Sequence, residues 1–230
     1  MESKLIELKD VWKTYKMGKV SVDAVSGVNL AINKGEFVVI TGQSGSGKST
    51  IMHLIGCLDV PSQGAVFLED KNIVSLSKSQ IAKIRGEKIG FIFQEFNLIP
   101  TLTALENVML PMEFQNNYHN AEERAKELLD LVGLKDRIHH KPTELSGGQS
   151  QRVAIARALA NDPEIILADE PTGNLDSKTG ENVISLLQHF YKEQGKTLII
   201  ITHDPNFIKQ LKNTTKVINL KDGKITNKKN

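Results

Sequence analysis

The chain of 230 residues has one cysteine, few aromatic residues and no long hydrophobic run. The single cysteine, Cys57, excludes a disulfide bond within the chain and fits a reducing compartment. No stretch approaches the roughly 18 consecutive apolar residues that a membrane-spanning helix needs. The charged first residues also lack the apolar core of a secretory signal. We therefore expect a cytoplasmic protein that reaches a membrane only through a partner.

The chain also has little excess charge of either sign. Lysine and arginine number 29 against 27 aspartates and glutamates, which gives a formal net charge of +2. This excess is too small to indicate nucleic-acid binding, and the lysines near the C-terminus fit a solvated tail. Hydrophobic residues make up 40% of the chain and charged residues 24%, an ordinary globular balance. A chain of this length accommodates one α/β domain with an appended subdomain.

Stretches with strand periodicity alternate with stretches of helical spacing, which is typical of a parallel α/β sheet. Alternating apolar and polar residues predict antiparallel strands over 5–15 and 28–32. Nearly continuous apolar runs predict buried parallel strands at 37–40, 89–93, 165–168 and 198–202. Helical spacing predicts helices over 120–132, with Asn120 as the N-cap, and over 146–160. Because 95–160 contains helices and no convincing strand, we expect a helical subdomain there, inserted between 1–94 and 161–230.

The stretch after the apolar run 37–40 has the pattern G-x-x-x-x-G-K-[ST], which binds a nucleotide triphosphate when it links a strand to a helix. Glycines let backbone N–H groups surround phosphate oxygens, and the helix N-terminus adds partial positive charge. Lys48 can reach the β- and γ-phosphates, and the Ser49 hydroxyl can bind Mg²⁺. The predicted phosphate-binding residues are Gly42, Gln43, Ser44, Gly45, Ser46, Gly47, Lys48, Ser49 and Thr50.

Three further elements follow downstream. The strand 165–168 ends in Asp169 and Glu170, which in phosphate-loop enzymes serve the Mg²⁺ shell and the attacking water. A second element, Leu145-Ser146-Gly147-Gly148-Gln149, opens a helix that Ser146 can cap, and an exposed cap with two glycines is also an anion site. His203 follows the strand 198–202, at the end where α/β sheets place their ligands.

Together these residues resemble the ATP-binding cassette (ABC) ATPases over essentially the whole chain. Residues 42–50 match the Walker A motif, 165–169 match Walker B, and 145–149 match the diagnostic signature. Gln94 matches the Q-loop glutamine, 173–176 match the D-loop that ends at Asp176, and Tyr15 resembles the A-loop aromatic that stacks on adenine. The resemblance implies a single ABC ATPase domain over 1–230, with a RecA-like α/β core, an N-terminal antiparallel β subdomain and the inserted helical subdomain.

The sequence around these motifs resembles that of the lipoprotein-release and macrolide-export subfamily (LolD/MacB type). This implies an ATPase subunit at the inner face of the cell membrane that drives a separate permease, for export or extraction of lipoprotein, peptide or drug-like substrates. Two residues depart from the usual pattern: Gln43 stands where proline is usual, and Ser150 where glutamine is usual. Neither departure removes a side chain that contacts phosphate.

The resemblance also implies a mechanism. Two cassettes close head to tail over two Mg-ATP, so that the signature of one subunit completes the phosphate site of the other. Glu170 would act as general base, His203 would fix the attacking water, and Lys48 would stabilise the transferring phosphoryl group. Mg²⁺ would be held by Ser49, Gln94 and, through a bound water, Asp169.

Two other functions stay open at this point. A cassette of this type can drive shape change in a membrane complex for cell-wall control or sensing, with no cargo moved. ABC ATPases of DNA repair or translation usually carry paired cassettes, zinc motifs or coiled-coil insertions, none of which the sequence contains, so we expect no nucleic-acid partner. If the chain is the ATPase subunit of a transporter, the apolar stretch after Gln94 predicts that Phe96 or Leu98 lines the groove for a permease helix.

Overall fold

The computed structural model describes residues 4–18, 20–115, 120–211 and 215–226. The chain forms two compact units, Met1–Ala82 with Thr197–Asn230, and Lys83–Lys196. The first unit therefore collects both ends of the sequence, and the second consists of one continuous segment. The boundaries predicted from the sequence, at 94 and 161, stay a prediction.

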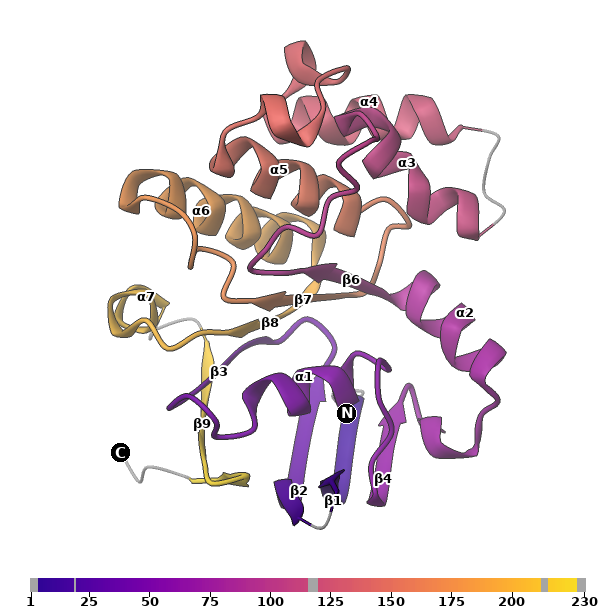
Figure 1. Cartoon of the computed structure of the whole chain (residues 1–230), viewed down its shortest axis with the longest axis vertical. Coiled ribbons are helices and arrows are strands. Elements are labelled where there is room, and N and C mark those ends of the chain that lie inside the picture. Colours follow the sequence, from indigo (N-terminus) through magenta and orange to yellow (C-terminus); the bar gives the residue numbers. More distant parts are fainter. Residues whose placement is uncertain (1–3, 19, 116–119, 212–214, 227–230) are drawn as a thin grey trace. The chain divides into compact units, whose positions relative to one another are not determined.

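The first unit contains an antiparallel sheet with the strand order β2-β1-β4-β5 (Figure 1). Its strands are β1 (Lys4–Met17), β2 (Val20–Asn33), β4 (Gln63–Leu68) and β5 (Lys71–Asn72). The long β1–β2 pair confirms the antiparallel strands predicted over 5–15 and 28–32, with both strands longer than expected. In β2, Val28, Leu30 and Ile32 are buried in alternation, which is why a period-two pattern was visible in the sequence, whereas register shifts interrupt the pattern in β1.

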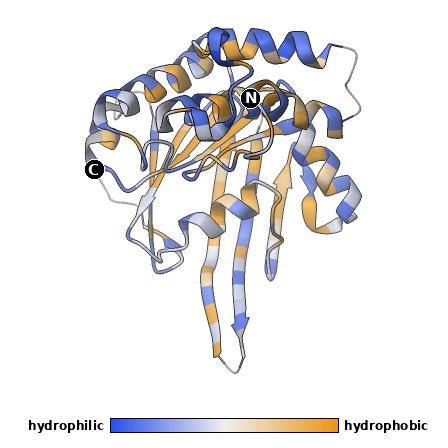
Figure 2. Ribbon diagram, turned by 45° about the horizontal axis from the view of Figure 1, so that its top comes forward, coloured by the Kyte–Doolittle hydropathy of each residue, from blue (hydrophilic) through white to orange (hydrophobic). Residues whose placement is uncertain are grey.

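The same unit contains parallel strands around β3 (Phe37–Gly42), which pairs with β8 (Thr197–Ile201) on one side and β9 (Lys216–Lys221) on the other. The short β10 (Lys224–Ile225) continues antiparallel to β9. No residue of 37–40 is more than 3% exposed, as expected for a strand covered on both faces. Such strands appear as hydrophobic runs in Figure 2. Helix α1 (Lys48–Ile55) follows β3, and α7 (Pro205–Leu211) follows β8.

The second unit pairs two parallel strands and packs helices together. Both strands predicted in this part of the chain are present, and β6 (Ile89–Ile92) pairs with β7 (Ile165–Asp169). In Figure 1, α3 (Ala104–Phe114), α4 (Ala121–Leu131) and α5 (Gly147–Ala158) lie against one another, and α6 (Ser177–Gln194) contacts α5. The described part of 95–160 contains helices and 3₁₀ turns (Lys135–Arg137 and Pro142–Glu144) and no strand, as expected.

Side chains cap the N-termini of helices α3 and α5 but not that of α4. Ser146 caps α5 in a capping box with Gln149, and Thr103 caps α3 in the same way with Glu106. Asn120 is the N-cap residue of α4, as predicted, but its side chain makes no capping hydrogen bond. Its φ of −138° and ψ of 21° differ from the extended backbone that aims an N-cap side chain at the first free N–H groups.

Some elements were not predicted. Strand β4 and helix α2 (Lys78–Lys88) went unnoticed, and α2 buries none of its residues, so it has no apolar stripe to detect. A 3₁₀ turn at Ile73–Ser75 was also missed. Cys57 lies beyond the end of α1, has a φ of 54° and is buried. Within the described residues no helix has the length and apolar character required to cross a membrane.

Candidate active site

The phosphate loop in the first unit has the backbone of an anion cradle. Gly45 and Gly47 have φ values of 75° and 98°, in the left-handed region that favours glycine. A side chain at Gly47 would also collide with the carbonyl oxygen of Ala24. Gln43, Ser44 and Gly45 are exposed, whereas Ser46 is buried. The loop therefore presents its backbone to solvent where the sequence predicts phosphate.

The polar side chains of the loop are arranged for a ligand. Lys48 Nζ donates to the carbonyl oxygens of Gly42 and Gln43, each at 2.9 Å. An ammonium has three N–H donors, so one remains for a phosphate. The Ser46 hydroxyl is buried and has no hydrogen-bond partner. Because a buried polar group without a partner is costly, a ligand at the loop would satisfy it. Ser49 and Thr50 lie in the first turn of α1, which contains no acidic residue to repel an anion.

Two other predicted residues lie in the first unit. Tyr15, on β1, is 36% exposed, and its hydroxyl donates to Asp59 Oδ2 at 3.2 Å. His203 is exposed directly after β8, whose neighbour β3 leads into the phosphate loop. The backbone before it is fixed by the hydrogen bond from Thr202 N–H to Ile40 O at 3.1 Å. Strand β8 therefore carries His203 at the same edge of the parallel strands as the loop.

In the second unit, Asp169 ends β7 and Glu170 follows it. Glu170 has a φ of 45°, a left-handed conformation that costs a non-glycine residue about 1–3 kcal/mol. Backbone outliers of this kind cluster at active sites. The turn after Glu170 is closed by Gly173 N–H, which donates to Glu170 O at 2.9 Å. The local structure therefore holds the predicted base in one strained conformation.

The D-loop holds the predicted Q-loop glutamine. Asn174 Nδ2 donates to Gln94 O at 2.8 Å, and a Cβ added to Gly173 would lie 2.9 Å from the amide nitrogen of Gln94. Asp176 caps α6 by accepting from Thr179 N–H at 3.0 Å. Hydrogen bonds from the Thr179 hydroxyl and backbone N–H lower the pKa of Asp176 below its ordinary value. Asp176 is thus a helix cap in the isolated chain.

The signature forms an exposed helix N-terminus. Ser146 and Gly147 are exposed, Leu145 is half-buried, and Gln149 Oε1 accepts from Ser146 N–H at 2.8 Å. The two glycines differ. A side chain at Gly148 would collide with the Thr179 methyl of α6, whereas one at Gly147 would meet no atom closer than 3.7 Å. Packing within the chain therefore explains Gly148 but not Gly147.

A cavity of about 380 Å³ opens beside the signature. Phe96 and Leu98 both line it, whereas Ile99 is exposed and Leu105 is buried. That this cavity is the groove for a permease helix stays a prediction. Phe96 and Asn97 have φ values of 58° and 50°, and the Arg157 guanidinium donates to both of their carbonyl oxygens. The residues that line the cavity are Glu95, Phe96, Leu98, Pro142, Thr143, Leu145, Gly147 and Ser150.

Known proteins match the chain over nearly its whole length. Residues 25–173 match the family described as ABC transporter. The chain belongs to the ABC transporter family. A Thermotoga maritima ABC transporter ATP-binding protein is 52% identical over 223 residues, which are 96% of this chain and 94% of that protein. The macrolide export ATP-binding/permease protein MacB of Bdellovibrio bacteriovorus is 49% identical over 221 residues, covering 96% of this chain but 33% of MacB.

A solved structure supports the same assignment. It is the dimeric post-hydrolysis state of the ATP-binding cassette MJ0796 bound to ADP and Pi, with a TM-score of 0.88 and 50% identity over 96% of this chain and 97% of that chain. The cassette is therefore an ABC-type ATPase of a membrane transporter, and the predicted fold class is confirmed. The predicted likeness to macrolide exporters is confirmed as well.

The structure of this cassette adds residues that sequence reasoning had not assigned. Gln151, fully buried on α5, donates from Nε2 to Pro171 O at 2.9 Å. Its signal in the sequence is a glutamine within the buried stripe of a helix. Burial lowers the pKa of the Arg157 guanidinium that holds the Q-loop. Lys13 and Asp59 contact Tyr15 and each other across 46 residues of sequence, and no local pattern could have shown this.

Proposed function

We propose that this ABC ATPase binds Mg-ATP, dimerises head to tail over two nucleotides, and drives a permease that is a separate chain. The observation that carries the proposal is the pairing, within the second unit, of an exposed signature N-terminus with the adjoining cavity. The exposed signature N-terminus would bind the nucleotide held by a second copy of the chain, and the cavity would accept a helix of a membrane protein. The MacB relatives are named as combined ATP-binding and permease proteins, which supports a permease partner.

Nucleotide binding is assigned to the first unit through the loop 42–50, with Tyr15 as the platform for the base. The loop fits a triphosphate because of its left-handed glycines, the unpartnered Ser46 hydroxyl and the third donor of Lys48. The Mg²⁺ that accompanies ATP would neutralise phosphate charge. The residues proposed as its ligands are Ser49, Gln94 and, through a bound water, Asp169.

Hydrolysis is assigned to Glu170 as general base. Its left-handed backbone is of the kind that clusters at active sites, and a general base contributes about 10²–10⁴ in rate. His203 would hold the attacking water and the γ-phosphate, and Lys48 would stabilise the charge that develops on the transferring group. In the dimer, the γ-phosphate would contact both the phosphate loop of one subunit and the signature of the other. We therefore expect ADP and phosphate to leave only after these contacts are broken.

Dimerisation is assigned to the signature. Ser146 accepts from Gln149 N–H at 3.3 Å, so its own O–H remains to donate to a ligand. Gly147 is exposed and is not required by packing, which is the situation expected where a phosphate approaches the backbone. The N-terminus of the 12-residue helix α5 adds its partial positive charge. These groups would complete the γ-phosphate cage of a second subunit.

The permease is assigned to the cavity beside the signature. Phe96 and Leu98 bring apolar surface to a pocket that also contains Glu95 and Thr143, a mixture suited to an amphipathic helix. The substrates expected are lipoprotein, peptide or drug-like molecules, and the membrane location follows from the permease. A regulatory complex without transport would use the same cavity, so the partner's own activity distinguishes the two.

The proposal is tested by reconstituting the full chain in liposomes with the permease chain encoded beside it. We expect ATPase activity to require Mg²⁺ and to rise when the permease and its substrate are present. Substrate release or export should stop when Glu170 is replaced by Gln. ATP hydrolysis that couples to no substrate movement, over a panel of lipoproteins, peptides and macrolides, would contradict transport and favour the regulatory role.

A further inference from the structure

Lys13 and Asp59 form a partly buried ion pair beside the base platform. Lys13 Nζ lies 2.6 Å from Asp59 Oδ1 and also donates to Val60 O at 2.8 Å. The two side chains are 12% and 28% exposed, so solvent screens them less than the surface pairs of this chain. Asp59 Oδ1 accepts a second bond from Val60 N–H at 2.7 Å. The carboxylate is therefore fixed in one orientation.

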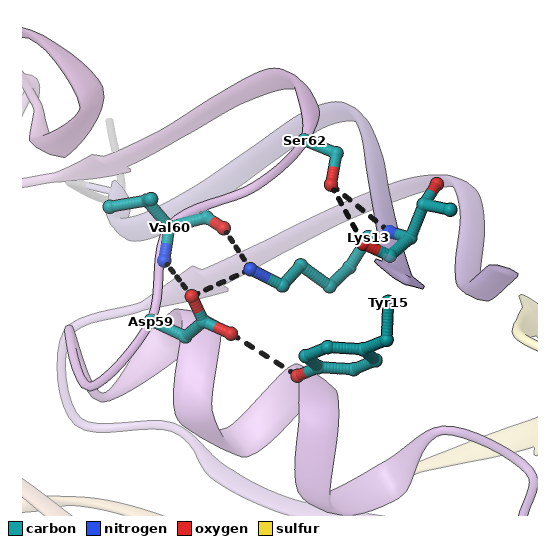
Figure 3. A network of polar contacts seen from close by, with 6 residues as sticks. Lys13, Tyr15, Asp59, Val60 and Ser62 are labelled. Carbon is teal, nitrogen blue, oxygen red and sulfur yellow. Dashed lines mark hydrogen bonds and ion pairs between the residues drawn. The ribbon is translucent and has the colours of Figure 1, made fainter. Parts of the chain in front are cut away.

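The fixed carboxylate holds Tyr15. Its second oxygen, Oδ2, accepts the hydrogen bond from the Tyr15 hydroxyl, and Lys13 Nζ lies over the tyrosine ring at 5.2 Å from the centroid (Figure 3). Lys13 and Tyr15 are two residues apart on β1, so their side chains leave the same face of the strand. Lys13 thus covers part of the ring, and the ring's remaining exposed surface is open to a ligand.

Asp59 also belongs to the segment that leaves the phosphate-loop helix. Helix α1 begins at Lys48 and ends at Ile55, and the backbone N–H groups of Leu58 and Asp59 still donate to His53 O. Further bonds tie this segment to β1: Ser62 N–H donates to Trp12 O at 2.8 Å, and Thr14 N–H donates to Ser62 Oγ at 3.0 Å. A continuous hydrogen-bonded segment therefore leads from the phosphate loop to the residue that holds Tyr15.

We propose that Asp59 and Lys13 are positioning residues for the nucleobase, which hold the Tyr15 ring at a fixed place relative to the phosphate loop. The inference rests on the proposed role of Tyr15 as the base platform. Stacking on a single ring gains less when the ring must first be ordered, because side-chain entropy is lost on binding. A ring already fixed by Asp59 has lost that freedom before the nucleotide arrives.

The proposal predicts an effect on the base and none on the phosphates. The test titrates the full chain with Mg-ADP and, separately, with magnesium pyrophosphate, which lacks the base, by calorimetry. Asp59→Ala should weaken ADP binding about 3- to 10-fold, as expected for the loss of one net hydrogen bond, and leave pyrophosphate binding unchanged. Tyr15→Phe keeps the ring and removes only the hydroxyl, so it should weaken ADP binding to a similar extent. In steady state, the KM for ATP should rise with little change in kcat.

A double-mutant cycle separates positioning from a general structural effect. In a Tyr15→Ala background, Asp59→Ala should cause no further loss of ADP affinity. Glu7→Gln breaks another carboxylate–lysine contact of β1, at 2.7 Å from Lys4, and should leave both ligands unaffected. If Asp59→Ala does not fold, Tyr15→Phe alone decides whether the hydroxyl contact matters.

The outcomes that overturn the proposal are distinct. Equal losses for ADP and pyrophosphate in Asp59→Ala would show that the substitution disturbs the phosphate loop itself. A loss that persists in the Tyr15→Ala background would show that Asp59 acts on the nucleotide without Tyr15. Unchanged ADP affinity in both Asp59→Ala and Tyr15→Phe, with a clear loss in Tyr15→Ala, would leave the platform intact and reject positioning. Unchanged affinity in Tyr15→Ala would reject the platform and, with it, the positioning role.

Discussion

The buried amide of Gln151 donates from Nε2 to the carbonyl oxygen of Pro171 at 2.9 Å. Gln151 lies on the signature helix α5, and Pro171 directly follows the proposed base Glu170. Both residues are buried, so water cannot replace the bond. One hydrogen bond within the second unit therefore connects the helix that would sense a second copy's ATP to the turn that carries the catalytic carboxylate.

Replacing Gln151 by Met should destabilise the cassette and slow hydrolysis. Methionine keeps the volume but leaves Pro171 O without a donor, which costs about 1–3 kcal/mol of unfolding free energy. Because small misplacements of catalytic groups can cost up to about 10²-fold, we expect kcat to fall about tenfold or more. Urea unfolding and steady-state kinetics measure the two effects. The control, Gln194→Met, changes an exposed glutamine at the end of α6 and should alter neither.

Replacing Glu170 by Gln should trap an ATP-dependent dimer. The substitution removes the general base, so kcat should fall by about 10²–10⁴, while the phosphate contacts remain. Sedimentation should show largely monomeric protein without nucleotide and a slowly dissociating dimer with Mg-ATP. Adding Ser146→Ala to this variant should weaken the dimer. A Glu170→Gln protein that stays monomeric at saturating Mg-ATP would contradict the head-to-tail arrangement.

Base selectivity should be low if Tyr15 supplies only a stacking face. Stacking is worth about 1–3 kcal/mol per base and tolerates different bases, so Tyr15→Ala should weaken ATP binding tenfold or more. The wild-type chain and the variant should each prefer ATP over GTP only modestly. Competition titrations with the two nucleotides measure this. Strong discrimination in the wild-type chain would require hydrogen bonds to the base edge and would rule out stacking as the sole contact.

The predictable parts of the molecule are those that local chemistry determines. The phosphate loop, the strands 37–40 and 165–168 and the Ser146 cap depend on neighbours within a few residues, so a period or a spacing reveals them. Helix α2 was missed because it buries no residue, and Asn120, although at the predicted N-cap position, makes no side-chain cap because its backbone is not extended. In both cases the signal was absent or was overridden by the path of the chain.

The positioning contacts could not be predicted, because they join distant residues. Lys13 meets Asp59 across 46 residues, and Arg157 reaches the carbonyl oxygen of Phe96 across 61. Neither contact leaves a periodic pattern in the sequence. The cavity beside the signature could be predicted only in part. The apolar stretch after Gln94 indicated an apolar surface there, but only the folded chain brings Pro142, Leu145 and Ser150 to it.

The Lys13–Asp59 pair should make the stability of the protein depend on pH in the acid range. Burial alone would raise the pKa of Asp59, but the hydrogen bonds from Lys13, Val60 N–H and Tyr15, with the charge of Lys13, outweigh it and lower the pKa below its ordinary value of 3.8. The resulting stability is present above that value and is lost as the pH falls through the lower, folded-state pKa. Asp59→Asn should therefore flatten the fall in melting temperature below about pH 4. Asp136→Asn, at an exposed acid, should follow the wild-type curve, and an unchanged slope in Asp59→Asn would contradict the ion pair.

The cavity beside the signature should be required for permease binding and not for folding. Leu98→Asp places a charge on its apolar lining, and burying a charge without a partner is strongly unfavourable, so co-purification with the permease should be lost. Basal ATPase activity of the free subunit should stay within a few-fold of wild type, because Leu98 lies outside the phosphate loop. Phe114→Asp is the matched control, since Phe114 is 78% exposed on α3 and does not line the cavity. If Leu98→Asp unfolds the protein, Leu98 is a core residue; if Phe114→Asp also loses the permease, the docking surface extends beyond the cavity.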